Sequence, residues 1–178
     1  MIEIPFVPTE LTFAAVWLLC RAAVWVRRKR IDRKREALLL LLYVDLAVLL
    51  RIAFFPRIPV DGRVQPLLFD PAAVLPLRVN LIPFVRLADF RDRRNMLVNT
   101  IGNIGMFIPS GIILPVLYRR LDRFGKVVAA GALLSLCIEL LQLPFSVRSS
   151  DVDDLIMNTA GAAIGYGICA LFRRTARR

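Results

Sequence analysis

Residues 139–158, where one apolar run gives way to the next, hold an unusual concentration of polar and charged side chains. Acids and amides dominate the stretch, together with one arginine: Glu139, Gln142, Arg148, Asp151, Asp153, Asp154 and Asn158. A charged side chain inside a membrane segment costs about 2.5–3.5 kcal/mol on insertion scales, and residues that carry this cost usually have a function. We therefore treat this stretch as the candidate functional site.

Two chemical interpretations fit these residues. In the first, Arg148 and the arginines of residues 86–94 hold a phosphate or another anion, while the carboxylates and amides bind polar parts of a lipid-linked headgroup. In the second, four carboxylates supply hard oxygen ligands for Mg²⁺ or Ca²⁺, which would hold a pyrophosphate or activate a water: Glu139, Asp151, Asp153 and Asp154. A structural interpretation competes with both, because the acids could pair with Arg148 while the amides satisfy one another.

Glu139 is the first candidate for a general base, and Asp151 and Asp154 are the further catalytic candidates. The amides that would position a ligand are Asn99, Asn103, Gln142 and Asn158. The sequence contains no histidine, which excludes Ser-His-Asp and Cys-His triads and the zincin motifs. Asp-x-Asp-Asp is a weak metal motif on its own, because acids are common at helix N-termini, where they complement the helix dipole.

Composition places the chain among membrane proteins. Of its 178 residues, 57% are hydrophobic, and they fall in long blocks. The net charge of +11 does not indicate nucleic-acid binding, because the basic residues lie in short loops between apolar runs, where they hold the cytoplasmic side and contact membrane lipid. We expect no nucleic-acid partner.

The apolar runs predict an all-α transmembrane bundle that forms a single membrane domain over residues 1–178. The five expected spans are 6–26, 37–56, 96–118, 127–147 and 155–172. Prolines interrupt the chain between spans two and three, which predicts a proline-rich interfacial segment there. The loops after spans one and three and the C-terminal tail together contain fifteen Lys or Arg, so we expect an N-outside/C-inside multi-pass protein of the cytoplasmic membrane.

With this topology the polar residues meet at the extracytoplasmic ends of the last three spans, around a pocket in the outer leaflet. Asp45 is an exception, because it lies in the middle of the second span, where it either has a partner on another helix or belongs to a polar cavity. Gly161 and Gly165 form a small-xxx-small pattern that packs helices closely, either within the chain or between the chains of a homo-oligomer.

Four motifs in a fixed order resemble those of the VanZ-like membrane proteins: RVNLIPF (78–84), NxxGNxxxFxPxGxxLP (99–115), SxxxExxQ (135–142) and RxxDxDDxxxNTxG (148–161). The resemblance covers residues 78–166, the expected VanZ-like core. By position, it carries over ten characteristic polar residues: Asn80, Asn99, Asn103, Glu139, Gln142, Arg148, Asp151, Asp153, Asp154 and Asn158. It implies a bacterial integral membrane protein of the cell envelope, and the family's namesake confers low-level resistance to teicoplanin.

Residues and resemblance together favour a protein that binds or modifies an anionic, lipid-linked envelope ligand, such as a polyprenyl-phosphate-linked one, and thereby gives tolerance to teicoplanin. Arg148 would contact the anion, and Asn80 would be a further ligand-binding residue. The alternative is a non-catalytic membrane subunit whose polar cluster is structural. A transporter is the third choice, because the chain has no internal repeat.

Overall fold

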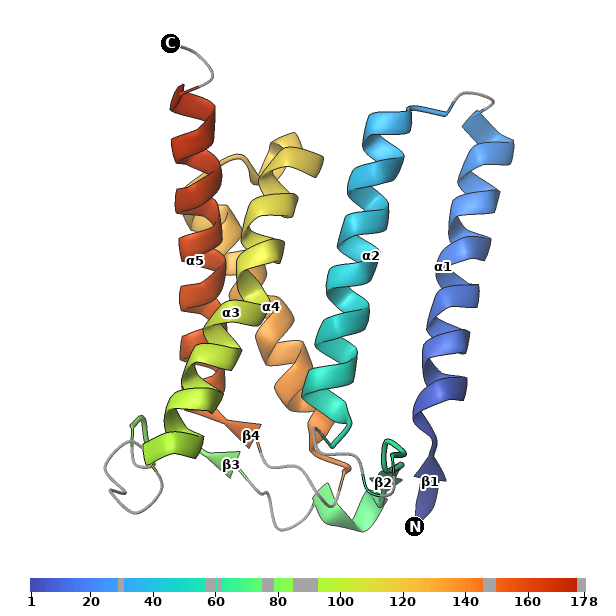
Figure 1. Cartoon of the computed structure of the whole chain (residues 1–178), viewed down its shortest axis with the longest axis vertical. Coiled ribbons are helices and arrows are strands. Elements are labelled where there is room, and N and C mark those ends of the chain that lie inside the picture. The colour runs from blue at the N-terminus through green and yellow to red at the C-terminus, as the bar shows by residue number, and fades with distance from the viewer. Residues whose placement is uncertain are drawn as a thin grey trace.

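Five long helices make up most of the structure, a computed structural model that describes residues 1–28, 31–56, 60, 62–74, 79–84, 93–145 and 150–175. The helices are α1 (Phe6–Arg28), α2 (Arg33–Phe54), α3 (Arg93–Leu117), α4 (Phe124–Gln142) and α5 (Val152–Thr175). Each contains a stretch that is long and apolar enough to cross a bilayer. The chain is therefore an all-α, multi-pass membrane protein, as its apolar runs predict (Figure 1).

The helix ends follow local sequence signals. α2 begins directly after Asp32, whose carboxylate accepts hydrogen bonds from the backbone nitrogens of Lys34 and Arg35 and so caps the helix. α4 ends at Gln142, earlier than its apolar run suggests, because Pro144 cannot continue the helix. α5 begins at Val152, so that the acids after it lie in its first turn, where they complement the helix dipole.

Two small sheets lie at one end of the bundle, and neither is predicted from the sequence. β1 (Ile2–Ile4) pairs antiparallel with β2 (Leu67–Phe69), and β3 (Val79–Asn80) pairs parallel with β4 (Ser150–Asp151). The 3₁₀-helix η1 (Pro71–Val74) lies between β2 and β3 in the chain. Figure 1 shows the sheets at the bottom, whereas the start of α2 and the end of α5 lie at the top.

α3 and α5 pack closely through small residues. A Cβ atom added at Gly161 would lie 2.1 Å from the carbonyl oxygen of Ile104, and one at Gly165 would lie 2.2 Å from that of Ile108. On the facing helix, a Cβ at Gly111 would lie 2.3 Å from the carbonyl oxygen of Ala162. Only glycine permits this approach of two backbones, so the small-xxx-small pattern packs α5 against α3 within the chain.

α2 joins this group through a small buried core and one polar pair. Leu49 and Ala53 of α2 pack with Phe107 of α3 and Ile138 of α4. The hydroxyl of Ser110 in α3 donates a hydrogen bond to the carboxylate of Asp45, which is buried. Asp45 thus has a partner on another helix, which is one of the two alternatives that its position in the sequence allows.

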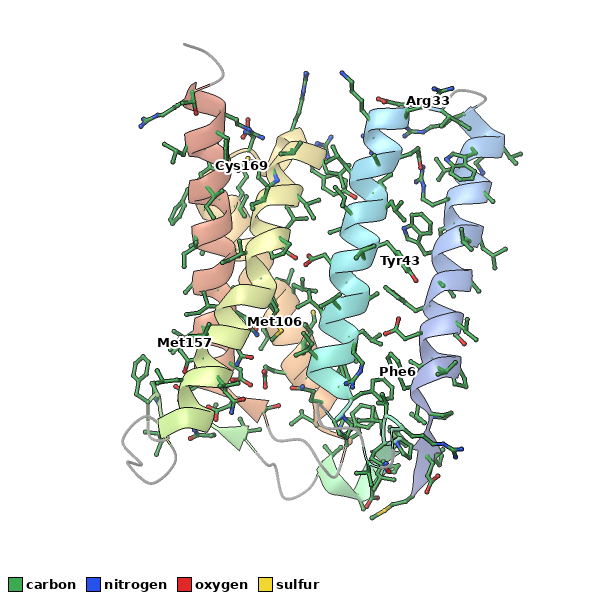
Figure 2. The ribbon with its side chains drawn as sticks, in the orientation of Figure 1. Phe6, Arg33, Tyr43, Met106, Met157 and Cys169 are labelled. Carbon is green, nitrogen blue, oxygen red and sulfur yellow. The ribbon has the colours of Figure 1, made fainter. Side chains whose placement is uncertain are left out.

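α1 lies at the edge of the bundle and has no buried residue. It contacts α2 through aromatic rings: Tyr43 lies between the two helices in Figure 2, with its ring centroid 5.4 Å from that of Phe13 and 4.9 Å from that of Trp17. Near the other end of this contact, Arg21 forms an ion pair with Glu36 of α2. The other four helices carry most of the buried polar side chains.

Candidate functional site

Polar side chains from α3, α4 and α5 gather with the β3–β4 pair at the sheet end of the bundle. Figure 2 shows many oxygen- and nitrogen-bearing side chains at this end of α3 and α5, near Met157. We call the following residues the polar cluster: Asn80, Asn103, Ser135, Glu139, Gln142, Ser150, Asp151, Asp153, Asp154 and Asn158.

The β3–β4 pair brings two distant motifs side by side. Its parallel register places Asn80 opposite Asp151, and the Asn80 Nδ2 donates to Asp151 Oδ1 at 3.1 Å. The same carboxylate oxygen accepts a 3.1 Å hydrogen bond from the backbone nitrogen of Asp153. Asp151 therefore acts as the N-cap of α5 and also holds the RVNLIPF segment against it.

Glu139 lies in the last turn of α4 and is 6% exposed. Its Oε2 accepts a hydrogen bond from the backbone nitrogen of Asp151 at 3.0 Å. Its main-chain carbonyl accepts a second one from the Ser150 hydroxyl at 2.6 Å. The end of α4 is therefore joined to β4 by both the backbone and the side chain of one residue.

The two acids in the first turn of α5 each hold a different segment. Asp153 Oδ1 accepts from the backbone nitrogen of Phe84 at 2.8 Å, and Phe84 has a φ of 64°, which is unfavourable for a bulky residue. Asp154 accepts a hydrogen bond from the Asn103 side chain of α3. The first turn of α5 thus fixes both a strained loop and the neighbouring helix.

Deeper in the bundle, Asn158 of α5 and Ser135 of α4 form a buried pair. The Asn158 Nδ2 donates to the Ser135 hydroxyl at 2.9 Å, and the two side chains are 2% and 0% exposed. The Asn158 Oδ1 is also buried, and it has no hydrogen-bond partner among the described residues. A buried acceptor in this state is rare in proteins and indicates a donor from water or a ligand.

Gln142 extends the polar cluster to α2. Its Nε2 donates a 2.6 Å hydrogen bond to the carbonyl oxygen of Ala53, in the last turn of α2. Gln142 is buried, and it lies one turn of α4 after Glu139. Four helices therefore contribute to this end of the bundle.

The structure places most of the predicted residues together. Eight of them lie in the polar cluster: Asn80, Asn103, Glu139, Gln142, Asp151, Asp153, Asp154 and Asn158. Asn99 is exposed on α3, one turn before the buried Asn103. Arg148, Arg86 and Arg91 lie outside the described residues.

Two serines of the polar cluster are absent from the candidate residues. Ser135 lies four residues before Glu139, which puts both on one face of α4, so the spacing alone could have identified it. Ser150 is different, because its hydrogen bond to the Glu139 carbonyl depends on how β4 folds back against α4. No spacing in the sequence indicates that contact.

The carboxylates of the polar cluster do not converge on one point. Among the described residues, no group of three or more His, Cys, Asp or Glu side chains is arranged to hold a metal ion. Oxygens of Glu139, Asp151 and Asp153 each accept a backbone N–H. The carboxylates and amides are suited to binding a ligand that offers hydroxyl or amide donors.

Comparison with known proteins agrees with the resemblance of the motifs. The sequence model of the family described as VanZ/LLP1 matches residues 39–173, a range that includes the whole polar cluster. Protein VanZ of Enterococcus faecium is 32% identical over 93 residues, which are 52% of this chain and 53% of that protein. The chain thus spans about half the length of the curated relative it matches. No solved structure matches it significantly.

Proposed function

The chain belongs to the VanZ/LLP1 family, and from this membership and the geometry of the polar cluster we propose that it binds a lipid-linked ligand of the bacterial envelope. The ligand has a headgroup with hydroxyl or amide donors and carries a phosphate or another anion. Binding or modification of this ligand at the outer leaflet gives tolerance to teicoplanin.

The observation that carries this proposal is the buried Asn158 Oδ1 without a described partner. A cluster that served only to join helices would pair this atom, because an unsatisfied buried acceptor costs about 1–3 kcal/mol. Asp154 lies one turn before Asn158 on α5, and Glu139 lies one turn after Ser135 on α4. A hydrogen-bond donor of the ligand that reached Asn158 Oδ1 would therefore pass the carboxylates of Asp154 and Glu139.

The anionic part of the ligand is assigned to Arg148. Arg148 precedes Ser150 by two residues in the sequence, and Ser150 donates a hydrogen bond to the Glu139 carbonyl. The Arg148 guanidinium can bind phosphate through two parallel hydrogen bonds. Where the ligand is modified as well as bound, Glu139 serves as the general base.

The second candidate is a non-catalytic membrane subunit whose polar cluster is structural. Three contacts between helices favour it: Asn103 with Asp154, Asn158 with Ser135, and Gln142 with the Ala53 carbonyl. Buried hydrogen bonds of this kind hold membrane helices together. The two candidates differ in what they predict for Glu139→Gln, which keeps the side chain's size and an acceptor oxygen but removes its charge.

The test is teicoplanin susceptibility of a sensitive bacterium that expresses the wild type, Glu139→Gln or Gly165→Ala. The last variant destabilises the α3–α5 contact without touching the polar cluster. A functional site predicts that Glu139→Gln abolishes tolerance at an unchanged membrane level, whereas Gly165→Ala lowers tolerance only in proportion to its level. A structural cluster predicts that tolerance follows the membrane level in both variants.

Lipid retention tests the ligand class directly. Native mass spectrometry of the wild type, purified in mild detergent, should show a bound polyprenyl-phosphate or other anionic envelope lipid, and Arg148→Ala should lose it. Wild-type protein without bound lipid, beside variants of equal stability, would support the non-catalytic subunit.

A further inference from the structure

A second polar region lies at the opposite end of the bundle, away from the polar cluster. A groove of about 710 Å³ opens there between the start of α2 and the end of α3, which is followed by the 3₁₀-helix η4 (Arg119–Leu121). We call it the basic groove. The lining residues that matter here are Lys34, Arg35, Leu38, Val116, Arg119 and Arg120.

Four cationic side chains from two separate elements meet in the basic groove. Lys34 and Arg35 come from the first turn of α2, and Arg119 and Arg120 come from η4. All four are exposed. The groove also contains Asp32, but its carboxylate already accepts hydrogen bonds from two backbone nitrogens as the cap of α2.

The neighbouring acids are paired with other arginines. Glu36 forms its ion pair with Arg21, and Asp122 forms its ion pair with Arg173 of α5. None of the four cations of the basic groove forms an ion pair with a described carboxylate. The groove therefore keeps an excess of positive charge that is available to an anion.

The wall of the basic groove changes from cationic to apolar along the helices. Leu38 lies four residues after Lys34 on α2, about 6 Å deeper at 1.5 Å per residue. Val116 faces it from the end of α3 and is 44% exposed. Both belong to stretches that are apolar enough to cross a membrane, so the groove joins a charged membrane boundary to a lipid-facing wall.

We propose that the basic groove binds one anionic phospholipid, with its phosphate among the arginine and lysine side chains and an acyl chain along Leu38 and Val116. Basic pockets between transmembrane helices bind anionic headgroups in this way. A small soluble anion would use the cations but leave the apolar wall without a role. The lipid would bridge the start of α2 and the end of α3, which both line the groove.

The test is native mass spectrometry of the full chain in mild detergent, titrated with phosphatidylglycerol. The Arg119→Gln/Arg120→Gln double variant removes two cations from the groove, and binding should weaken about 30-fold, as expected for two cations near an anionic lipid surface. The matched control is Arg123→Gln/Arg174→Gln, which removes the same charge from exposed residues at the same end but outside the groove. The control should bind like the wild type.

Three results would overturn the proposal: equal binding by the groove and control variants, equal binding of phosphatidylcholine and phosphatidylglycerol, or displacement of the lipid by inorganic phosphate alone. The last would identify a site for a free anion. Melting temperatures check that the variants fold. Lys34→Gln/Arg35→Gln repeats the test from the α2 side, so the result does not depend on one pair of substitutions.

Discussion

The carboxylate of Glu139 in α4 accepts a 3.0 Å hydrogen bond from the backbone nitrogen of Asp151, at the start of α5. Because the donor is a backbone N–H, any residue other than proline at position 151 supplies it. Residue 139 must supply an oxygen atom to accept this hydrogen bond, but that oxygen need not carry a charge. This separates the structural role of Glu139 from any role that depends on its ionisation.

Glu139→Gln should keep the stability of the wild type, because the amide oxygen can accept the same hydrogen bond. Glu139→Ala should lower the free energy of unfolding by about 1–3 kcal/mol, because it leaves a buried N–H without an acceptor. Unfolding in mixed detergent micelles measures both. Equal destabilisation by the two variants would show that the charge itself holds the fold, and would weaken the case for a functional site.

The Asn103–Asp154 hydrogen bond should contribute a measurable coupling between α3 and α5. A double-mutant cycle with Asn103→Ala and Asp154→Ala should give a coupling of about 0.6 kcal/mol, a typical value for such pairs in a membrane. A control cycle combines Asn103→Ala with Asp122→Ala. Asp122 follows η4, at the other end of the bundle. The two effects of this control cycle should simply add, because distant sites are independent. A coupling of zero in the first cycle would contradict the contact.

Gly165→Ala should destabilise the protein by about 1–3 kcal/mol, the usual cost of overpacking. Its new Cβ would lie 2.2 Å from the Ile108 carbonyl oxygen. Gly167→Ala is the matched control on the same helix, because nothing lies within 4 Å of its added Cβ, and it should be neutral or slightly stabilising. Equal effects in detergent unfolding would show that α3 and α5 do not pack this closely.

Much of the fold follows from local patterns, for physical reasons that particular residues illustrate. A long apolar run has few stable states in a bilayer other than a helix, and Pro144 ends α4 for steric reasons. The polar residues gather because each lies near the end of its span, and three consecutive spans alternate in direction. The sequence alone therefore predicts that Glu139, Asp154 and Asn103 lie at one level of the bundle.

The remaining features depend on contacts between distant segments. Helical spacing puts Asn99 and Asn103 on one face, but only the packing of α3 decides that Asn103 is buried while Asn99 is exposed. The β3–β4 pair is two residues long, too short for a periodic pattern. The hydrogen bond from Ser150 to the Glu139 carbonyl also requires the turn between α4 and α5 to be known.

Removal of divalent cations should leave the melting temperature unchanged. The acids that could hold Mg²⁺ or Ca²⁺ are Glu139, Asp151, Asp153 and Asp154, and three of them accept backbone hydrogen bonds between 2.8 and 3.1 Å. A metal would have to compete with these contacts. Thermal unfolding with EDTA, and with added Mg²⁺ or Ca²⁺, measures this. A metal site would be established if EDTA lowered the melting temperature, if Mg²⁺ or Ca²⁺ restored it, and if Asp153→Asn abolished this effect.

The polar cluster should face the outside of the cell, and the basic groove the cytoplasm. The two lie at opposite ends of the bundle, and the connections at the groove end carry the excess of Lys and Arg that marks the cytoplasmic side. Leu81→Cys and Arg119→Cys, each in a chain without its three native cysteines, report the two ends, because both positions are exposed. A membrane-impermeant maleimide on intact cells should label position 81 and should reach position 119 only after the membrane is opened.

The reverse labelling pattern would place the polar cluster at the cytoplasmic leaflet. An envelope ligand exposed on the outer face could not then reach Asn158 or Glu139, and the proposed route to teicoplanin tolerance would be wrong. The phospholipid proposal would not fail with it, since anionic lipids can occupy either leaflet and the four cations of the basic groove would be unchanged. Labelling of both positions from one side would contradict the five-span arrangement itself, because α3 separates them and crosses the membrane once.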